Sequence, residues 1–237
     1  MKVLSLFDGI SCGRVALERA GIPVEAYYAS EIDKNAIAIS AKNYPDIVQI
    51  GDVQNIPFNP DWNFDLLIGG SPCQDLSNYK YDRGDVKGLE GDKSSLFYYY
   101  VKALKELKPK YFILENVASM QKKWVDVISQ ELGVEPIMIN SNALCAAERK
   151  RLYWTNIPNV IQPKDKGISL QDIVLSTEEV DPKYWYTKYD HIYHGDDKKV
   201  EATILLNGHH HSNGSSPLRY VFYWQLFFVP LKRVYQT

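Results

Sequence analysis

The sequence has few cysteines and no apolar segment long enough to cross a bilayer. Its 237 residues include three cysteines, and no two of them form a Cys-x-x-Cys pair. A disulfide framework or a structural zinc site is therefore not expected, and a reducing cytoplasm is the predicted location. The longest apolar stretch, 220–231, is too short to span a membrane and contains Gln225. Asp8 interrupts the N-terminal apolar run too early for a signal peptide, so neither export nor membrane insertion is predicted.

The chain also lacks a strong charge of either sign, internal repeats and low-complexity tracts, and its formal net charge is -2 at pH 7. Its 45% hydrophobic and 24% charged residues are typical of a soluble globular protein. A near-neutral balance does not indicate whether nucleic acid is bound, because it can conceal a local basic groove. Three consecutive histidines, His209–His211, do not converge well on one ion, so a turn is favoured there and no metal site is predicted.

Strand-like apolar runs alternate with helix-like segments over residues 1–158, which predicts an α/β fold with a mostly parallel twisted sheet and helices on both faces. Helices are expected after a cap at Ser11, from about Asp33, near Leu96 and near Trp124. The predicted strands are 3–7, 26–30, 47–50, 65–68, 111–114, 136–139 and 152–157. Residues 159–237 are predicted to form a second, smaller and irregular region.

The loop after the first predicted strand has the features of a cofactor site. Phe7, Asp8, Gly9, Ile10 and Gly13 lie between that strand and the first helix, where open α/β sheets bind nucleotide-like ligands. The glycines permit close backbone approach, but their spacing is not the Gly-x-Gly-x-x-Gly of dinucleotide sites. A carboxylate here would repel a pyrophosphate. It suits a cofactor with a positive centre and no phosphate, for which S-adenosylmethionine is the obvious candidate.

Two more carboxylates follow at the ends of the next two predicted strands. Glu31 lies 22 residues after Gly9, where this fold places an acceptor for ribose hydroxyls. Asp52 can accept a hydrogen bond from an adenine amino group. The structural alternatives are that Asp8 caps the first helix and that Asp52 shapes a turn. Acidic residues at three successive strand ends favour cofactor binding over these alternatives.

A cysteine follows the fourth predicted strand on a stiff turn. Cys73 comes directly after Gly69-Gly70-Ser71-Pro72, and Pro72 fixes its own φ and biases Ser71 toward an extended conformation. Chemistry in open α/β folds gathers beyond the carboxyl ends of the strands, so this position favours a nucleophile. The alternative is a small buried structural cysteine, which is the usual role of an isolated one.

Three further charged residues are predicted near the same edge of the sheet. Glu115 ends the fifth predicted strand, and Arg149 and Arg151 alternate on an extended segment, so that both guanidinium groups project to one face. The alternatives are a turn carboxylate and a solvated basic patch.

Together these groups suit methyl transfer to C5 of cytosine. Attack of the Cys73 thiolate on C6 makes C5 nucleophilic, provided that Glu115 donates a hydrogen bond or proton to N3. Arg151 would bind O2 and stabilise the developing charge, while Arg149 would hold a phosphate or brace the loop. Loss of the C5 proton and of the cysteine then restores the aromatic ring.

The order of these motifs resembles that of the C5-cytosine DNA methyltransferases, and most closely the branch with the vertebrate de novo enzymes and their phage and bacterial relatives. The matching motifs are Phe-Asp-Gly-Ile-x-x-Gly, Ser-Glu-Ile, Gly-Asp-Val, Gly-Gly-Ser-Pro-Cys-Gln, Glu-Asn-Val and Glu-Arg-Lys-Arg-Leu-Tyr-Trp, within residues 1–158. The resemblance implies a Rossmann-like, S-adenosylmethionine-dependent methyltransferase fold, with S-adenosylhomocysteine as the product. It implies that Cys73 is the nucleophile, Glu115 the N3 partner, and Arg149 and Arg151 the substrate arginines. The residues that it implies against the cofactor, beyond the first loop, are Glu31, Ile32, Asp52, Val53, Ser71 and Pro72.

The implied substrate is double-stranded DNA, in a phage or restriction-modification setting, and the target base must leave the stack to be reached. The polar loop 74–93 is then a candidate lid, and its candidate DNA contacts are Gln74, Ser77, Lys80, Arg83 and Lys87. The family's later motifs are not found in 159–237, so this region is predicted to be a reduced target-recognition region, atypical or truncated. Its apolar segment 218–231 is a candidate surface for a homo-oligomer or a partner chain. An RNA cytosine-5 methyltransferase and a non-catalytic DNA-binding or partner subunit are the alternatives.

Overall fold

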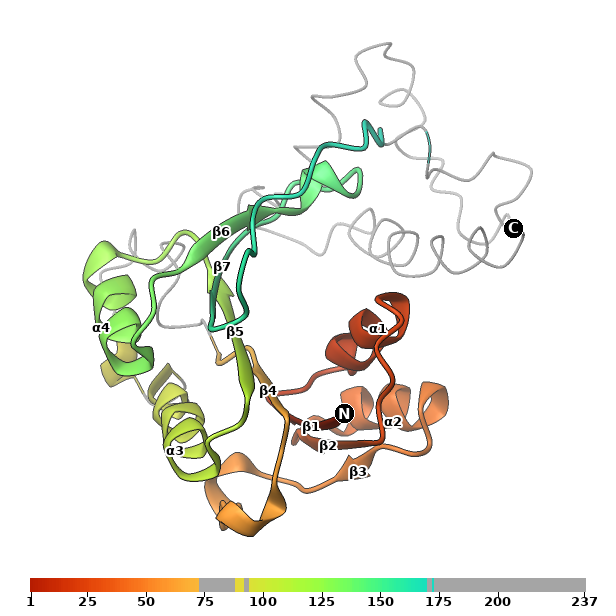
Figure 1. Cartoon of the computed structure of the whole chain (residues 1–237), viewed down its shortest axis with the longest axis vertical. Helices are drawn as coiled ribbons and strands as arrows, with labels where there is room; N and C mark the ends of the chain where they lie inside the picture. Colours follow the sequence, from red (N-terminus) through yellow and green to blue (C-terminus); the bar gives the residue numbers. More distant parts are fainter. Residues whose placement is uncertain (73–87, 92–93, 170–171, 173–237) are drawn as a thin grey trace, which may run out of the picture. The chain divides into compact units, whose positions relative to one another are not determined.

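The computed structural model describes residues 1–72, 88–91, 94–169 and 172 (Figure 1). The chain forms two compact units that interleave along the sequence. The first comprises Met1–Ile139 and Lys150–Gln162, and the second comprises 140–149 and the residues from Pro163 onward. The first unit contains the strands and helices that carry most of the predicted site.

Seven strands form one sheet in the order β3-β2-β1-β4-β5-β7-β6. They are β1 (Lys2–Leu6), β2 (Ala26–Ser30), β3 (Val48–Gln49), β4 (Leu66–Gly69), β5 (Tyr111–Val117), β6 (Ile137–Asn140) and β7 (Lys150–Thr155). The strands from β1 to β5 pair in parallel, and β7 pairs antiparallel with β5, so the predicted mostly parallel sheet is confirmed. From β1 the chain proceeds outward to β2 and β3, and then returns to β4 on the other side of β1. The boundary between β1 and β4 is therefore a topological switch point, where such sheets bind ligands.

Helices cover both faces of the sheet, as predicted (Figure 1). They are α1 (Cys12–Arg19), α2 (Lys34–Asn43), α3 (Phe97–Leu107) and α4 (Lys122–Leu132). The pair α1 and α2 lies on one side of the sheet, and the pair α3 and α4 lies on the other. Short 3₁₀ helices occur at Val53–Asn55, Pro60–Trp62, Gly88–Glu90, Ser94–Leu96 and Ser141–Ala143.

Two apolar layers join the helices to the sheet. The larger layer contains Leu4 of β1 and Phe97 of α3, and the smaller contains Val3 of β1, Tyr27 of β2 and Leu17 of α1. Successive residues of β1 thus face opposite layers, as the period of a strand requires. Because both faces of the central strands are buried, these strands appear in the sequence as short continuous apolar runs, which made them predictable.

The expected role of Ser11 as a helix cap is wrong. Ser11 precedes α1 with φ 61° and ψ 40°, and its side chain makes no capping hydrogen bond. Its hydroxyl instead bonds to the side chains of Asp8 and Ser40. A left-handed backbone at this position turns the hydroxyl away from the first helical N–H groups, so the local cap gives way to tertiary contacts.

The bounds of most strands differ from the prediction by one to three residues, and two of these differences concern the site. β5 continues through Glu115 to Val117, because β7 pairs with it as far as the Val117–Arg151 position. β7 begins at Lys150, so Arg151 lies in the strand whereas Arg149 precedes it and belongs to the second unit. That both guanidinium groups project to one face stays a prediction.

Candidate active site

The loop after β1 passes through left-handed backbone conformations at three of five consecutive positions. The φ angles of Phe7, Gly9 and Ser11 are 57°, 61° and 61°. This region is ordinary for glycine but costs another residue on the order of 1 kcal/mol or more, and such residues gather at functional sites. Contacts from neighbouring elements must therefore hold the loop in this shape.

Glu31, directly after β2, supplies one set of these contacts. Its Oε2 accepts the backbone N–H of Gly9 at 2.8 Å, and its Oε1 accepts the N–H groups of Ile32 and Asp33 at 2.7 and 2.9 Å. A carboxylate offers about four acceptor sites, so these bonds leave one for a ligand. The side chain is thereby fixed before any cofactor binds, while its acceptance of both ribose hydroxyls stays a prediction.

Asp8 is buried, and protein hydroxyls bind both of its carboxylate oxygens. The Tyr27 hydroxyl donates to Oδ1 at 2.8 Å, and the Ser11 hydroxyl donates to Oδ2. The carboxylate therefore supports the loop from the protein interior. A direct contact between Asp8 and a cofactor stays a prediction.

The other predicted cofactor residues differ in exposure. Asp52 accepts the N–H of Gln54 at 3.0 Å through Oδ1 and caps the 3₁₀ helix Val53–Asn55, so its turn-shaping role is observed. The side chain of Val53 is buried in the larger apolar layer, whereas that of Ile32 is 70% exposed. Ile10, in the loop after β1, and Gly13, in the first turn of α1, are half-buried. An exposed apolar side chain beside Glu31 is suited to a planar base, because ligand sites combine apolar surface with few polar groups.

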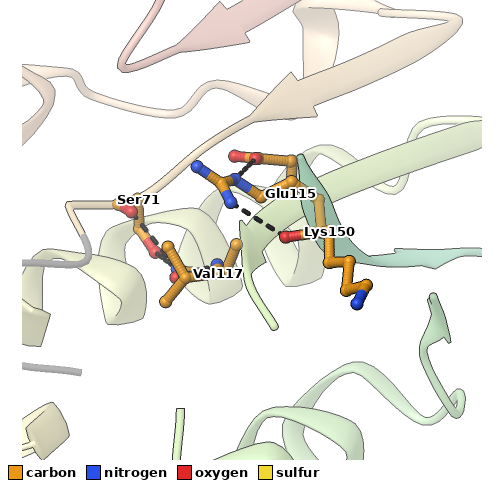
Figure 2. A network of polar contacts seen from close by, with 6 residues as sticks. Ser71, Glu115, Val117 and Lys150 are labelled. Atoms are coloured by element: carbon orange, nitrogen blue, oxygen red, sulfur yellow. Dashed lines mark hydrogen bonds and ion pairs between the residues drawn. The ribbon is translucent and has the colours of Figure 1, made fainter. Parts of the chain in front are cut away.

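The segment Gly70–Pro72 leaves β4 at the carboxyl edge and is tied to the adjacent strand β5. Asn116, whose side chain is 1% exposed, donates from Nδ2 to the carbonyl oxygen and to Oγ of Ser71, both at 3.2 Å (Figure 2). Its Oδ1 accepts the N–H of Val117 at 2.8 Å, which orients the amide. The Ser94 hydroxyl donates to the Pro72 carbonyl at 3.2 Å. The backbone that leads into Cys73 is thus held by two polar side chains.

Glu115 and Arg151 form an ion pair on one face of the β5–β7 ladder. The Nε–H of Arg151 donates to Oε1 of Glu115 at 2.7 Å, and its Nη1 donates to the Lys150 carbonyl at 2.8 Å (Figure 2). Glu115 lies opposite Tyr153 in the register, two residues beyond Arg151, so both side chains project from the same face. The side chains are 34% and 21% exposed, which leaves the pair accessible to a ligand.

Two glycines at the end of β4 make room for side chains on either side. A Cβ at Gly70 would lie 3.3 Å from Oε2 of Glu115, and a Cβ at Gly69 would lie 2.6 Å from Cδ2 of Tyr100. The free oxygen of Glu115 therefore reaches the backbone of the segment before Cys73. Glu115 therefore lies beside Gly70, and Arg151 is paired with Glu115. This is the predicted neighbourhood of the segment that leads into Cys73.

The remaining predicted residues lie in the second unit or outside the described residues. Arg149 lies in the second unit, where its N–H donates to Oδ1 of Asn140 at 3.2 Å and its carbonyl accepts the N–H of Ser141 at 3.1 Å. Several predictions lie outside the described residues. They concern Cys73, Gln74, Ser77, Lys80, Arg83, Lys87, His209–His211 and the apolar segment 218–231.

Four polar residues to which the sequence analysis gave no role support the site. Asn116 and Ser94 hold the segment before Cys73, whereas Tyr27 and Ser40 belong to the contacts around Asp8 and Ser11. The buried residues of strands or helices among them are Tyr27, Ser40 and Asn116. A buried polar group needs a partner, so a polar residue in such a segment is a signal that could have found them.

Neither metal binding nor membrane insertion has support among the described residues. Over 1–72, 88–91, 94–169 and 172, no three His, Cys, Asp or Glu side chains lie close enough together to hold a metal ion. In the same part of the chain, no helix is long and apolar enough to cross a membrane.

Two solved structures share the fold of this chain. One is a putative DNA modification methyltransferase encoded within a prophage of E. coli, with a TM-score of 0.52 and 24% identity over 77% of this chain and 52% of that chain. The other is the DNMT2 of Spodoptera frugiperda, with a TM-score of 0.57 and 22% identity over 77% of this chain and 61% of that chain. The switch point between β1 and β4, with its two sets of polar residues, thus belongs to a Rossmann-like methyltransferase fold.

The sequence narrows this class to one family. The family model of the C-5 cytosine-specific DNA methylases matches residues 1–181, and the chain belongs to this family. The orphan methyltransferase M.SPRI of Bacillus phage SPR is 40% identical over 122 residues, which are 51% of this chain and 27% of that protein. The type II methyltransferase M.FnuDI of Fusobacterium nucleatum is 29% identical over 231 residues, which are 91% of this chain and 64% of that protein. The chain thus spans from about a quarter to less than two-thirds of the length of these relatives.

Proposed function

We propose that this chain transfers a methyl group to C5 of cytosine in double-stranded DNA, through a covalent bond between Cys73 and C6 of the base. The observation that carries the proposal is the Glu115–Arg151 pair beside Gly70–Pro72 at the carboxyl edge of the sheet. The pair offers an acid-base group and a planar donor fork, next to the backbone that leads into the nucleophile. An electron-poor ring with adjacent nitrogen and oxygen acceptors, such as cytosine, matches this set.

The loop after β1 and its neighbours fit S-adenosylmethionine as the cofactor. A Cβ at Gly9 would have no heavy atom within 4 Å, so the loop backbone there is open to a ligand. Glu31 has an acceptor site left, Ile32 offers an exposed apolar surface, and Oδ2 of Asp52 accepts no hydrogen bond from the described residues. S-adenosylmethionine would supply a methyl group on a sulfonium centre, leaving S-adenosylhomocysteine. The carboxylates of the chain would bind and orient it.

In the proposed reaction, the thiolate of Cys73 forms a bond to C6, and the electron pair of the C5–C6 double bond becomes available at C5. Arg151 occupies Oε1 of Glu115, which leaves Oε2 to carry a proton toward N3. The guanidinium has further N–H donors, which would bind O2 as negative charge develops on the ring. After the C5–methyl bond forms, a solvent base removes the C5 proton. The bond between C6 and sulfur then breaks and the N3 proton returns to Glu115, so that the aromatic ring, the thiolate and the acid-base group are all regenerated.

DNA is the proposed substrate because the family is one of DNA methylases and the relatives are named methyltransferases from bacteria and their phages. In a duplex the target carbon is stacked, so the base must be flipped at a cost of a few kcal/mol. The candidate phosphate and base contacts are Gln74, Ser77, Lys80, Arg83 and Lys87. The proposed place of action is the cytoplasm of a bacterium or of a phage-infected host.

The first test is transfer of labelled methyl from S-adenosylmethionine to duplex DNA by the full chain. Cys73→Ala is expected to abolish transfer, while the matched variant Cys145→Ser, which alters a half-buried cysteine of the second unit, is expected to retain it. Normal transfer by Cys73→Ala would overturn the mechanism. Competition between duplex DNA and tRNA in the same assay separates the DNA activity from an RNA activity.

The second test traps the covalent bond. In DNA with 5-fluorocytosine at the target position, fluorine cannot leave as a cation, so the adduct is expected to persist through denaturing electrophoresis. The adduct is expected with the natural chain and not with Cys73→Ala. If methylation occurs but no adduct forms, the covalent route is wrong. If calorimetry detects no S-adenosylmethionine binding to the folded chain, the alternative of a non-catalytic subunit is favoured.

A further inference from the structure

We propose that Tyr27, acting through Asp8, is a positioning residue that sets the shape of the cofactor loop. The inference rests on the proposed function, since it concerns binding of S-adenosylmethionine by the same loop. Tyr27 lies on β2, four residues before Glu31, and its side chain is 1% exposed. No cofactor contact is assigned to Tyr27 itself.

The hydroxyl of Tyr27 is one end of a buried polar chain that crosses the loop. It donates to Oδ1 of Asp8 at 2.8 Å, while Oδ2 of Asp8 accepts the Ser11 hydroxyl. The oxygen of that hydroxyl lies 2.6 Å from Oγ of Ser40 on α2. Ser11 and Ser40 are fully buried. The chain of bonds therefore links β2, the loop and α2 without access to water.

The phenol acts in this chain as a permanent donor. Burial, and then the charge of Asp8, raise the pKa of Tyr27 far above its ordinary value. The hydroxyl thus keeps its proton at neutral pH and can donate to Asp8. A buried carboxylate is costly unless its oxygens are bonded, so loss of this donor would leave half of Asp8 unsatisfied.

The position of Gly13 supports the same role for the hydroxyl. A Cβ on Gly13 would lie 2.9 Å from Oη of Tyr27 and 3.2 Å from Cδ1 of Ile68. The first turn of α1 therefore approaches the phenol closely, and this requires glycine. The phenol therefore fixes the position of the first turn of α1 and the orientation of the Asp8 side chain in the loop.

The polar chain explains how a non-glycine residue is held at φ 61°. Ser11 has this angle, and its hydroxyl bonds to Asp8 and Ser40 replace the helix cap that it does not form. Backbone in this region persists when surrounding contacts determine it. Ser11 and Phe7 flank Gly9. The orientation of the Gly9 backbone toward a ligand therefore depends on the Tyr27–Asp8–Ser11–Ser40 chain of hydrogen bonds.

The decisive variant is Tyr27→Phe in the full chain, which removes one oxygen atom and keeps the ring. We expect the Kd and KM for S-adenosylmethionine to rise about tenfold, while kcat at saturating cofactor stays within about twofold, because one buried hydrogen bond to a charge is lost and the Glu115–Arg151 pair is untouched. The matched control is Tyr28→Phe, the next residue of β2, which faces the larger layer and packs edge-on against Phe64. The control is expected to leave Kd, KM and kcat unchanged.

Two results would overturn the inference: an equal Kd for Tyr27→Phe and Tyr28→Phe, or a fall in kcat that matches the loss of folded protein with an unchanged KM. Ser40→Ala tests the other end of the hydrogen-bond chain. It also provides a measurement of the inference if Tyr27→Phe fails to fold. It is expected to raise Kd about threefold, since it removes one neutral bond, and an unchanged Kd would count against the inference. If the natural chain binds no S-adenosylmethionine, the proposed function fails. If it binds and both variants bind equally well, only this inference fails.

Discussion

The loop after β1 and the Glu115–Arg151 pair, both at the carboxyl edge of the sheet, hold carboxylates in different ways. In and beside the loop, hydroxyl and backbone N–H groups bind Asp8 and Glu31, and these donors carry no charge. In the pair, the guanidinium of Arg151 binds Glu115, and both side chains are partly exposed. Neutral donors held by buried contacts form a rigid receptor, whereas a partly hydrated ion pair can exchange partners with a substrate. The comparison indicates that the proposed cofactor loop is preorganised by the fold, whereas the proposed chemical pair can respond to a substrate.

The strongest test of this contrast is Glu115→Gln. We expect methyl transfer to fall on the order of 10²- to 10⁴-fold, because the amide keeps the shape but cannot transfer a proton. The Kd for S-adenosylmethionine is expected to be unchanged, since Glu115 lies on β5, outside the proposed cofactor loop and its neighbours on β1 and β2. Single-turnover transfer and calorimetry measure the two quantities.

A matched control for this variant is Glu106→Gln, which makes the same chemical change in the exposed pair with Lys102 on α3. It is expected to alter neither quantity. If Glu115→Gln lowered cofactor affinity as much as it lowered the rate, the proposed separation of cofactor binding from the Glu115–Arg151 pair would be wrong.

Glu31→Gln is expected to show the opposite pattern. The amide nitrogen would face one of the N–H donors of Gly9, Ile32 or Asp33, so the loop should lose its shape. We expect the Kd for S-adenosylmethionine to rise about 10- to 100-fold with a much smaller change in kcat at saturation. Calorimetry and initial rates at varied cofactor concentration test this, and a selective fall in kcat would contradict it.

The adjacent glycines of β4 sharpen the comparison within one strand end. Gly70→Ala places a Cβ 3.3 Å from Oε2 of Glu115, so we expect a roughly tenfold slower transfer at nearly unchanged stability, since the carboxylate must shift slightly. Gly69→Ala places a Cβ 2.6 Å from the buried ring of Tyr100 and is expected to cost about 1–3 kcal/mol of unfolding free energy. Denaturant unfolding and transfer rates should distinguish the two variants. If Gly69→Ala and Gly70→Ala had equal effects on stability and on rate, the proposed difference between the two glycines would be wrong.

The smallest effect is expected from Lys105→Ala, which removes the 2.8 Å pair with Glu131 between α3 and α4. Exposed ion pairs contribute about 0–1 kcal/mol, so stability should change little and methyl transfer not at all. This variant gives the baseline for an ion pair without a functional role. If Glu115→Gln destabilised the fold far more than Lys105→Ala, the Glu115–Arg151 pair would be structural.

The order of strands and helices was predictable because each central strand is a short apolar run and each helix has regular apolar spacing. The bonds of Ser11 were not predictable in this way. A cap is a local pattern, whereas its observed partner Ser40 is 29 positions away. Periodicity also does not give strand direction, so the antiparallel entry of β7 needed the structure.

The candidate site shows the same division. Motifs singled out Glu31, Glu115 and Arg151, and their proposed roles stay predictions. The contact of Asn116 was not predictable, since its amide bonds to Ser71, 45 positions earlier in the chain. Residues proposed to act on a ligand are marked by motifs in the sequence, whereas residues that hold them are defined by contacts that only the fold creates.

The register of β4 and β5 has a consequence for how such a protein can diversify. The two strands pair from Leu66–Tyr111 to Gly69–Leu114, and the Asn116–Ser71 bonds extend the connection beyond the last pair. The approach to Cys73, the proposed nucleophile, and Glu115, its proposed acid-base partner, are therefore carried by two neighbouring strands. In the proposed enzyme, changes to segments outside these two strands would leave this arrangement intact.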